Sequence, residues 1–249
     1  MPRYFLEVSY KGTNYSGFQI QQNANSIQEE IQKAYQVLQK ETISLTGSSR
    51  TDAGVHALQN FFHFDFDGEI NPHFAYKMNA ILPDDIVVEK LIPVKDSAHC
   101  RFDAISREYK YFIYRHKDPF LKDSAFYFPY KLNVELMQQA AVMIKAYTDF
   151  TSFSKRNTQV KTFNCCIMES NWGWEDECLV FYVKADRFLR GMVRALVATM
   201  LKIGRGKMTI AAFKNVIEEK DSSKASFATP SQGLFLMKVN YPKCYFERP

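Results

Sequence analysis

The stretch Gly47-Ser48-Ser49-Arg50-Thr51-Asp52-Ala53-Gly54-Val55-His56 lies between two runs with strand character, residues 42–46 and the aromatic residues 59–66. The sequence therefore predicts a loop that joins two strands. Two glycines and two serines in this loop permit tight turns of the backbone. Arg50 and Asp52 lie two residues apart, and an arginine beside an aspartate keeps the carboxylate ionised and fixes its direction.

The residues after the carboxylate are small. Ala53 and Gly54 would let a bulky ligand approach the backbone. The loop therefore suits a carboxylate that acts as a nucleophile or a base on a large substrate. For an isolated Arg-x-Asp triplet, an aspartate that caps a turn and a solvated arginine would be the commoner interpretation.

The composition is typical of a soluble globular protein. The chain has 249 residues, of which 46% are hydrophobic, 24% charged and 15% aromatic. This length allows one large domain or two small ones. The formal charge of +5 permits a nucleic-acid partner without requiring one.

The cysteines and histidines show no metal-ligand spacing. The five cysteines form no Cys-x-x-Cys, so we expect reduced thiols, a cytoplasmic location and no zinc or other metal site. We expect no signal peptide at Met1, and no apolar run reaches membrane-spanning length. Gly204-Arg205-Gly206 lacks the rest of a dinucleotide fingerprint, so we expect no nucleotide cofactor.

Periodicity and capping residues predict the order of the elements. Strands are expected at residues 4–10, 59–66, 86–94, 107–116 and 234–239, a hairpin at 161–170 and 178–185 with its turn at 171–174, and helices after Ser26, Asn71, Asn133 and Thr209 and at 187–202. Each half reads strand, helix, strands, helix, strand. We therefore expect an α+β fold of two lobes, residues 1–103 and 104–249, with mostly antiparallel sheet and a site in the central cleft.

Basic residues concentrate in the helix expected at residues 187–202. Arg190 and Arg194 are four residues apart and would share one side of that helix. Arg194 would require a partner if it were buried in so apolar a helix. Six basic and no acidic residues occur between Arg187 and Lys207. This run favours RNA binding through Arg190 and Arg205, with a solvated face as the alternative.

The string from Arg50 to His56 resembles, without a break, the central motif of the TruA family of tRNA pseudouridine synthases. Five further segments resemble the family in the same order: Gly12–Gln19, Arg107–Tyr111, Asp149–Phe153, Arg187–Arg194 and Gly233–Leu236. Three positions depart from its pattern. Lys11 stands where the family usually has aspartate, Phe18 where it has tryptophan, and Gly191 where it has histidine.

The resemblance implies an enzyme that isomerises uridine to pseudouridine at positions 38, 39 and 40 of the tRNA anticodon stem-loop. Asp52 would be the catalytic carboxylate, with Arg50 beside it and Arg194 paired to it. Tyr109 would lie against the target base, and Leu234 would pack in the uracil pocket. Whether Asp52 attacks the sugar or removes its 2′-proton stays open at this point.

The resemblance also implies the pseudouridine synthase fold, with two similar α/β lobes, and a homodimer that binds the anticodon arm of tRNA. No redox cofactor, metal or ATP is expected, because the detached uracil stays bound and the reaction is an isomerisation. Two other functions remain as alternatives. One is a non-catalytic RNA-binding or RNA-folding protein that uses the same basic groove. The other is a metal-dependent nuclease built on the acidic pairs Asp65/Asp67 and Asp84/Asp85, although these read more simply as acids at loop edges.

Overall fold

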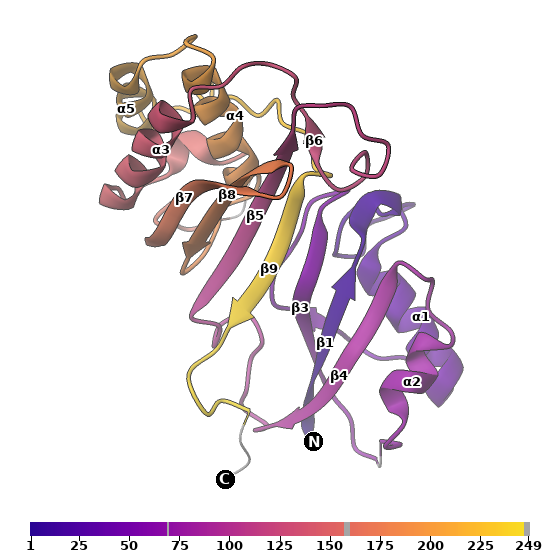
Figure 1. The fold of residues 1–249 in the computed structure, drawn as a ribbon. Helices are drawn as coiled ribbons and strands as arrows, with labels where there is room; N and C mark the ends of the chain where they lie inside the picture. Colours follow the sequence, from indigo (N-terminus) through magenta and orange to yellow (C-terminus); the bar gives the residue numbers. More distant parts are fainter. Residues whose placement is uncertain (69, 157–159, 247–249) are drawn as a thin grey trace. The chain divides into compact units, whose positions relative to one another are not determined.

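The computed structural model describes residues 1–68, 70–156 and 160–246 (Figure 1). The chain forms two compact units, one containing Met1–Ile105 with Leu236–Pro249 and the other Ser106–Phe235. The predicted boundary between residues 103 and 104 lies close to the first break. However, that prediction left the C-terminal segment with the second lobe, whereas the segment from Leu236 onward clusters with the first unit. Within the three described ranges, no helix is long and apolar enough to cross a lipid bilayer.

An antiparallel sheet forms the centre of the first unit. Strand β1 lies between β3 and β4 (Figure 1). The short β2 pairs with β3. Tyr35 of α1 packs against Phe64 of β3 and Phe74 of α2, with ring centroids 5.7 and 6.0 Å away. The elements are β1 (Arg3–Tyr10), the 3-10 turn η1 (Gly12–Asn14), α1 (Ile27–Gln39), β2 (Thr46–Gly47), β3 (His56–Asp65), α2 (Phe74–Asn79) and β4 (Ile86–Val94), while β9 (Leu234–Asn240) runs from the second unit into the first.

The middle of strand β3 is buried on both of its faces. The sequence predicts a half-buried strand, but residues 61–64 are all buried. The C-terminal segment explains the difference, because its aromatic side chains surround Phe5 and Phe61. The ring of Tyr241 lies 5.7 Å from that of Phe5 and 5.4 Å from that of Phe61, and Phe246 stacks on Phe61 at 6.0 Å. This packing also accounts for the membership of residues 236–246 in the first unit.

In the second unit, β8 lies between β5 and β7 in an antiparallel sheet, and β6 pairs with β5 in parallel. Helices α3, α4 and α5 lie together on one side of this sheet (Figure 1). The indole N–H of Trp172 in β7 donates to Met200 Sδ of α4 at 3.2 Å, which joins sheet and helix layer. The elements are β5 (Ser106–Tyr114), β6 (Phe126–Tyr127), α3 (Val134–Met143), the 3-10 turns η2 (Ile144–Ala146) and η3 (Thr151–Phe153), β7 (Ile167–Glu175), β8 (Cys178–Ala185), α4 (Met192–Gly204) and α5 (Ile210–Glu218).

The β7–β8 hairpin turns later than predicted. Residues 171–174 were expected in the turn, but they belong to β7, which continues to Glu175. The turn falls instead at Asp176, whose φ of 48° lies in the left-handed region that aspartate tolerates. Trp172 and Gly173 therefore keep ladder partners in β8, Phe181 and Val180.

Helix α4 begins at Met192 and not at Arg187. Gly191 precedes it with a φ of +74°, a left-handed conformation that breaks helical continuity. The prediction that Arg190 and Arg194 share one helix side is therefore wrong, because Arg190 lies before the helix. Glycine at position 191, one of the departures from the family pattern, suits this backbone.

The strand predicted at residues 42–46 is also wrong, apart from Thr46 at the start of β2. The reason lies in helix α1. The side-chain amides of Gln28 and Gln32 donate to the carbonyl groups of Leu45 and Ile43, so these carbonyls are bonded to a helix and not to a neighbouring strand. Despite these local differences, both units combine helices with mostly antiparallel strands, as the α+β prediction requires.

Candidate active site

The loop that carries Asp52 is held by a buried amide. Asn60 of β3 has no exposed surface. Its Nδ2 donates to the carbonyl of Ser49 at 3.0 Å and to the hydroxyl of Tyr10 at 3.1 Å, and its Oδ1 accepts from Ser48 Oγ at 2.7 Å. One side chain thus fixes the first half of the loop to β3 and β1. No local motif in the sequence identifies Asn60 for this role.

The second half of the loop rests on the segment after β1. The N–H of Gly12 donates to His56 Nδ1 at 3.1 Å. A Cβ at Gly12 would lie 2.1 Å from the carbonyl oxygen of Val55, so a larger residue there would displace the loop. Gly54 has a φ of +74°, which closes a turn in which the N–H of Val55 donates to the carbonyl of Asp52 at 3.2 Å. Asp52 therefore lies in a tight turn with a defined backbone.

The two charged residues of the loop differ in exposure. Asp52 is half-buried, whereas Arg50 is exposed. Arg50 lines a cavity of about 290 Å³ together with Phe18, Gly47 and Phe102. The predicted action of Arg50 on Asp52 stays a prediction. Phe18, a departure from the family pattern, stacks on Phe62 with ring centroids 4.3 Å apart.

Arg194 makes a reciprocal contact inside the second unit. Its Nε and Nη2 donate to the carbonyl of Thr229 at 2.9 and 2.5 Å, and Thr229 Oγ1 donates to the carbonyl of Arg194 at 2.8 Å. This half-buried arginine in an apolar helix therefore has a partner that the sequence did not indicate. Its pairing with Asp52 stays a prediction.

The chain from Thr229 leads directly to Leu234, which is buried at the start of β9. The hydroxyl of Tyr111 donates to the carbonyl of Pro230 at 2.7 Å, and the N–H of Phe112 donates to the carbonyl of Gly233 at 2.8 Å. Burial raises the pKa of Tyr111, so this hydroxyl stays a donor at neutral pH. Tyr111 is thus a core residue, as predicted, and it supports the segment that carries Leu234.

The other predicted residues of the second unit have varied surroundings. Tyr109 of β5 is 8% exposed, and the ring of Phe188 meets its ring at 79° with centroids 4.9 Å apart. Arg190 is exposed. The guanidinium of Arg205 lies 3.8 Å from the ring centroid of Tyr130, so this arginine has a cation–π partner in its own unit. RNA contacts of Arg190 and Arg205 stay predictions.

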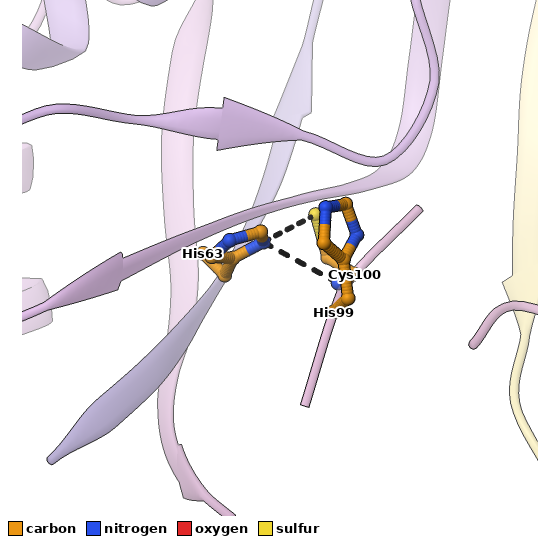
Figure 2. A group of neighbouring side chains, drawn as sticks. All are labelled: His63, His99 and Cys100. Carbon is orange, nitrogen blue, oxygen red and sulfur yellow. Dashed lines mark hydrogen bonds between the residues drawn. The ribbon is translucent and has the colours of Figure 1, made fainter. Parts of the chain in front are cut away.

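Three side chains in the first unit bring metal-ligating atoms together. These atoms of His63, His99 and Cys100 all lie within 4.8 Å of one another, although the sequence shows no metal-ligand spacing (Figure 2). Each already takes part in hydrogen bonds. His63 Nδ1 lies 3.2 Å from Cys100 Sγ, the thiol donates to the carbonyl of Thr46 at 3.1 Å, and His99 Nδ1 accepts two backbone N–H bonds at 3.2 and 3.3 Å. We therefore interpret the cluster as a structural network. Burial, assisted by the nearby Arg3 charge, lowers the pKa of His63 to about 4.

One member of each acidic pair of the nuclease alternative has structural partners. Asp65 forms a bidentate pair with Arg3, with distances of 2.7 and 2.8 Å. The hydrogen bonds and charge of Arg3 lower the pKa of the Asp65 carboxyl. Asp85 accepts hydrogen bonds from the hydroxyl of Tyr15 and from Asn14. These contacts favour structural roles for both carboxylates.

Sequence comparison with known proteins points to one family. A sequence profile described as tRNA pseudouridine synthase matches residues 7–103 and 140–242 of this chain. The chain belongs to the tRNA pseudouridine synthase family. Relatives named tRNA pseudouridine synthase A include those of Parabacteroides distasonis (46% identical over 99% of this chain and 98% of the relative), Porphyromonas gingivalis (42%, 99% and 100%) and Staphylococcus aureus (36%, 95% and 90%). The family match includes the loop that carries Asp52 and the helix that carries Arg194.

Proposed function

We propose that this chain isomerises uridine to pseudouridine in tRNA, with Asp52 as the catalytic carboxylate. One observation carries the assignment of Asp52. In a member of the tRNA pseudouridine synthase family, the Arg50-to-His56 string occupies a loop whose backbone is fixed by Asn60 and Gly12, and this loop leaves the Asp52 carboxylate half-buried. A loop whose backbone is already fixed can present its carboxylate to a bound substrate with little reorganisation.

The reaction rearranges one nucleotide and leaves its atoms unchanged in number. The bond between N1 and C1′ breaks, the uracil turns, and C5 bonds to C1′. The proton on C5 then leaves, and N1 is protonated. Asp52 serves either as a nucleophile at C1′ or as the base that removes the 2′-proton, and both roles require the ionised carboxylate.

Residues of the second unit have proposed roles in the same reaction. Tyr109 provides an aromatic face for the extruded base, and its hydroxyl handles the proton that leaves C5. Leu234 packs against the uracil. Arg194 pairs with the catalytic carboxylate in addition to its contact with Thr229. Arg190 and Arg205 bind the RNA backbone.

The finer predictions concern the substrate and the assembly. We propose uridines at positions 38, 39 and 40 of the anticodon stem-loop as the targets, and a homodimer of chains that each have two similar lobes around a central cleft. We also propose a cytoplasmic reaction that needs no cofactor. These proposals rest on the resemblance of the sequence to the TruA family.

The test is the substitution Asp52→Asn, which keeps the shape of the side chain and removes its charge. Unmodified tRNA is incubated with each variant, and pseudouridine is mapped at every position. Asp52→Asn should form no product while it binds tRNA normally, and the exposed control Asp84→Asn should match wild type. A near-wild-type rate for Asp52→Asn would overturn its assignment. Tight tRNA binding by wild type without any product would favour the non-catalytic RNA-binding alternative.

A further inference from the structure

The cavity beside the loop that carries Asp52 has a basic and aromatic lining. It has a volume of about 290 Å³, and it is lined by residues of the loop, Gly47 and Arg50, and by residues of a distant turn, His99, Arg101 and Phe102. Two arginines contribute to the lining, and among its described residues there is no carboxylate. The volume is near the lower end of the range for small-molecule sites, about 300 Å³. It suits one nucleotide better than a large cofactor.

Phe102 is an exposed aromatic residue in a defined position. It is 74% exposed. The ring of His99 lies 4.2 Å from its ring at an angle of 35°, and the guanidinium of Arg101 lies 5.7 Å from its ring centroid. Proteins that bind single-stranded nucleic acids use exposed aromatic rings to stack on bases and nearby cations to contact phosphates.

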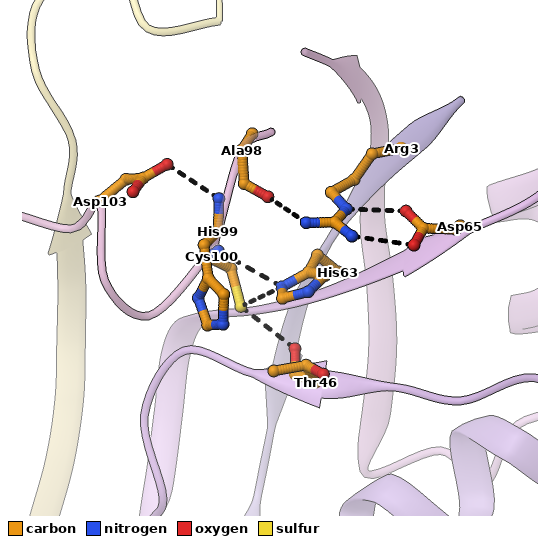
Figure 3. A network of polar contacts seen from close by, with 8 residues as sticks. All are labelled: Arg3, Thr46, His63, Asp65, Ala98, His99, Cys100 and Asp103. Atoms are coloured by element: carbon orange, nitrogen blue, oxygen red, sulfur yellow. Dashed lines mark hydrogen bonds and ion pairs between the residues drawn. The ribbon is translucent and has the colours of Figure 1, made fainter. Parts of the chain in front are cut away.

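The turn of residues 98–103, which contains Phe102, is held by several hydrogen bonds (Figure 3). Arg3 donates to the carbonyl of Ala98 at 2.8 Å. The N–H of His99 donates to Asp103 Oδ2 at 2.8 Å, and the hydroxyl of Tyr245 donates to the same oxygen at 2.5 Å. These bonds hold the chain on both sides of Phe102.

The same turn is also bonded to the start of the catalytic loop. The thiol of Cys100 donates to the carbonyl of Thr46, the first residue of β2, at 3.1 Å, and the loop begins at the next residue (Figure 3). His63 of β3 supports that thiol with its Nδ1 at 3.2 Å. The His63–His99–Cys100 cluster therefore fixes the position of the turn relative to the loop.

We propose that this cavity is a nucleotide-binding subsite for the substrate RNA, separate from the position of the reacting uridine. A base stacks on Phe102, and Arg101 and Arg50 bind a neighbouring phosphate. The proposal rests on the proposed function, since it takes RNA as the substrate. It assigns Phe102 and Arg101 to substrate binding and gives the buried cluster the role of holding them beside the loop that carries Asp52.

The test compares affinity for unmodified tRNA among variants made in the Asp52→Asn background, so that no turnover occurs. Phe102→Ala should weaken binding by roughly 5- to 140-fold, as the loss of one stacked base predicts. Phe102→Tyr should bind like the parent. Tyr76→Ala is the matched control, because Tyr76 is a 76% exposed aromatic residue of the same unit that does not line the cavity.

The salt dependence of binding tests the phosphate contact. Arg101→Gln should lower the slope of log affinity against log salt by about one, and Arg101→Lys should retain it. Because Phe102 and Arg101 are exposed, thermal unfolding should be unchanged in these variants. A change of less than about twofold for Phe102→Ala, with an unchanged slope for Arg101→Gln, would overturn the subsite. Absence of pseudouridine with wild-type protein would instead refute the proposed function, and it would leave the affinity comparison interpretable.

Discussion

Replacing Asn60 by alanine removes the amide that holds the loop of residues 47–56, which carries Asp52. The substitution deletes bonds to the Ser49 carbonyl, the Tyr10 hydroxyl and the Ser48 hydroxyl. The Tyr10 hydroxyl keeps its hydrogen bond with Thr51 at 2.8 Å, so it loses only one of its two partners. The Ser49 carbonyl loses its buried donor, which costs about 1–3 kcal/mol, and the other two bonds contribute about 1 kcal/mol each. The expected loss of unfolding free energy is therefore about 3–5 kcal/mol.

This loss is smaller than the stability of many domains, about 5–15 kcal/mol, so the variant should be folded at room temperature. The loop that carries Asp52 should be displaced, and a misplacement of about 1 Å can slow a reaction by about 100-fold. We expect single-turnover pseudouridine formation at saturating tRNA to fall by about this factor, with little change in tRNA affinity. Urea unfolding measures the stability of the same samples.

Asn79→Ala provides the matched control. The amide of Asn79 makes two hydrogen bonds to the backbone of Val88, at 2.8 and 2.9 Å, and neither involves the loop that carries Asp52. This variant should lose stability and keep its single-turnover rate. If Asn60→Ala is destabilised as expected but reacts at the wild-type rate, then the proposed role of Asn60 in positioning Asp52 is wrong.

The remaining predictions concern the base, the partner of the carboxylate, pH and metal. Tyr109→Phe should bind tRNA normally and slow the final proton transfer, whereas Tyr109→Ala should also weaken tRNA binding. Arg194→Ala should slow single-turnover pseudouridine formation more than it weakens tRNA affinity. Unchanged single-turnover rates in Tyr109→Phe or Arg194→Ala would show that the residue lacks its proposed role. The pKa of His63 is about 4 in the folded chain and about 6.5 when unfolded, so the unfolded state binds the proton at the higher pH. The free energy of unfolding should therefore fall by about 3 kcal/mol as the pH drops from about 6.5 to about 4. Urea unfolding at several pH values should show this fall in wild type and a smaller one in His63→Gln. Pseudouridine formation should persist in excess EDTA with prefolded tRNA. Magnesium-dependent cleavage of the tRNA, without pseudouridine, would favour the nuclease alternative.

Local patterns in the sequence determined several elements correctly. The side chains of Ser26, Asn133 and Thr209 each accept a backbone N–H at the start of α1, α3 and α5, as the capping pattern predicted. Strand β4 occupies the predicted residues 86–94. These features succeed because a cap or a strand period depends on residues close together in the chain. The loop around Asp52 was likewise identified from ten consecutive residues, and the family match includes these residues, while the catalytic role of Asp52 stays a prediction.

Tertiary structure decided what depends on residues far apart in the chain. Tyr241 and Phe246 bury the second face of β3, which a period-two pattern cannot show because the covering segment lies near the other end of the chain. In the sequence, Asn60 is indistinguishable from an ordinary polar residue, and only the fold brings it into contact with the loop that carries Asp52. His63 and Cys100 meet through packing of separate segments, so no spacing rule could find them. Buried polar groups need partners wherever the fold supplies them, and the sequence alone cannot show where those partners will be.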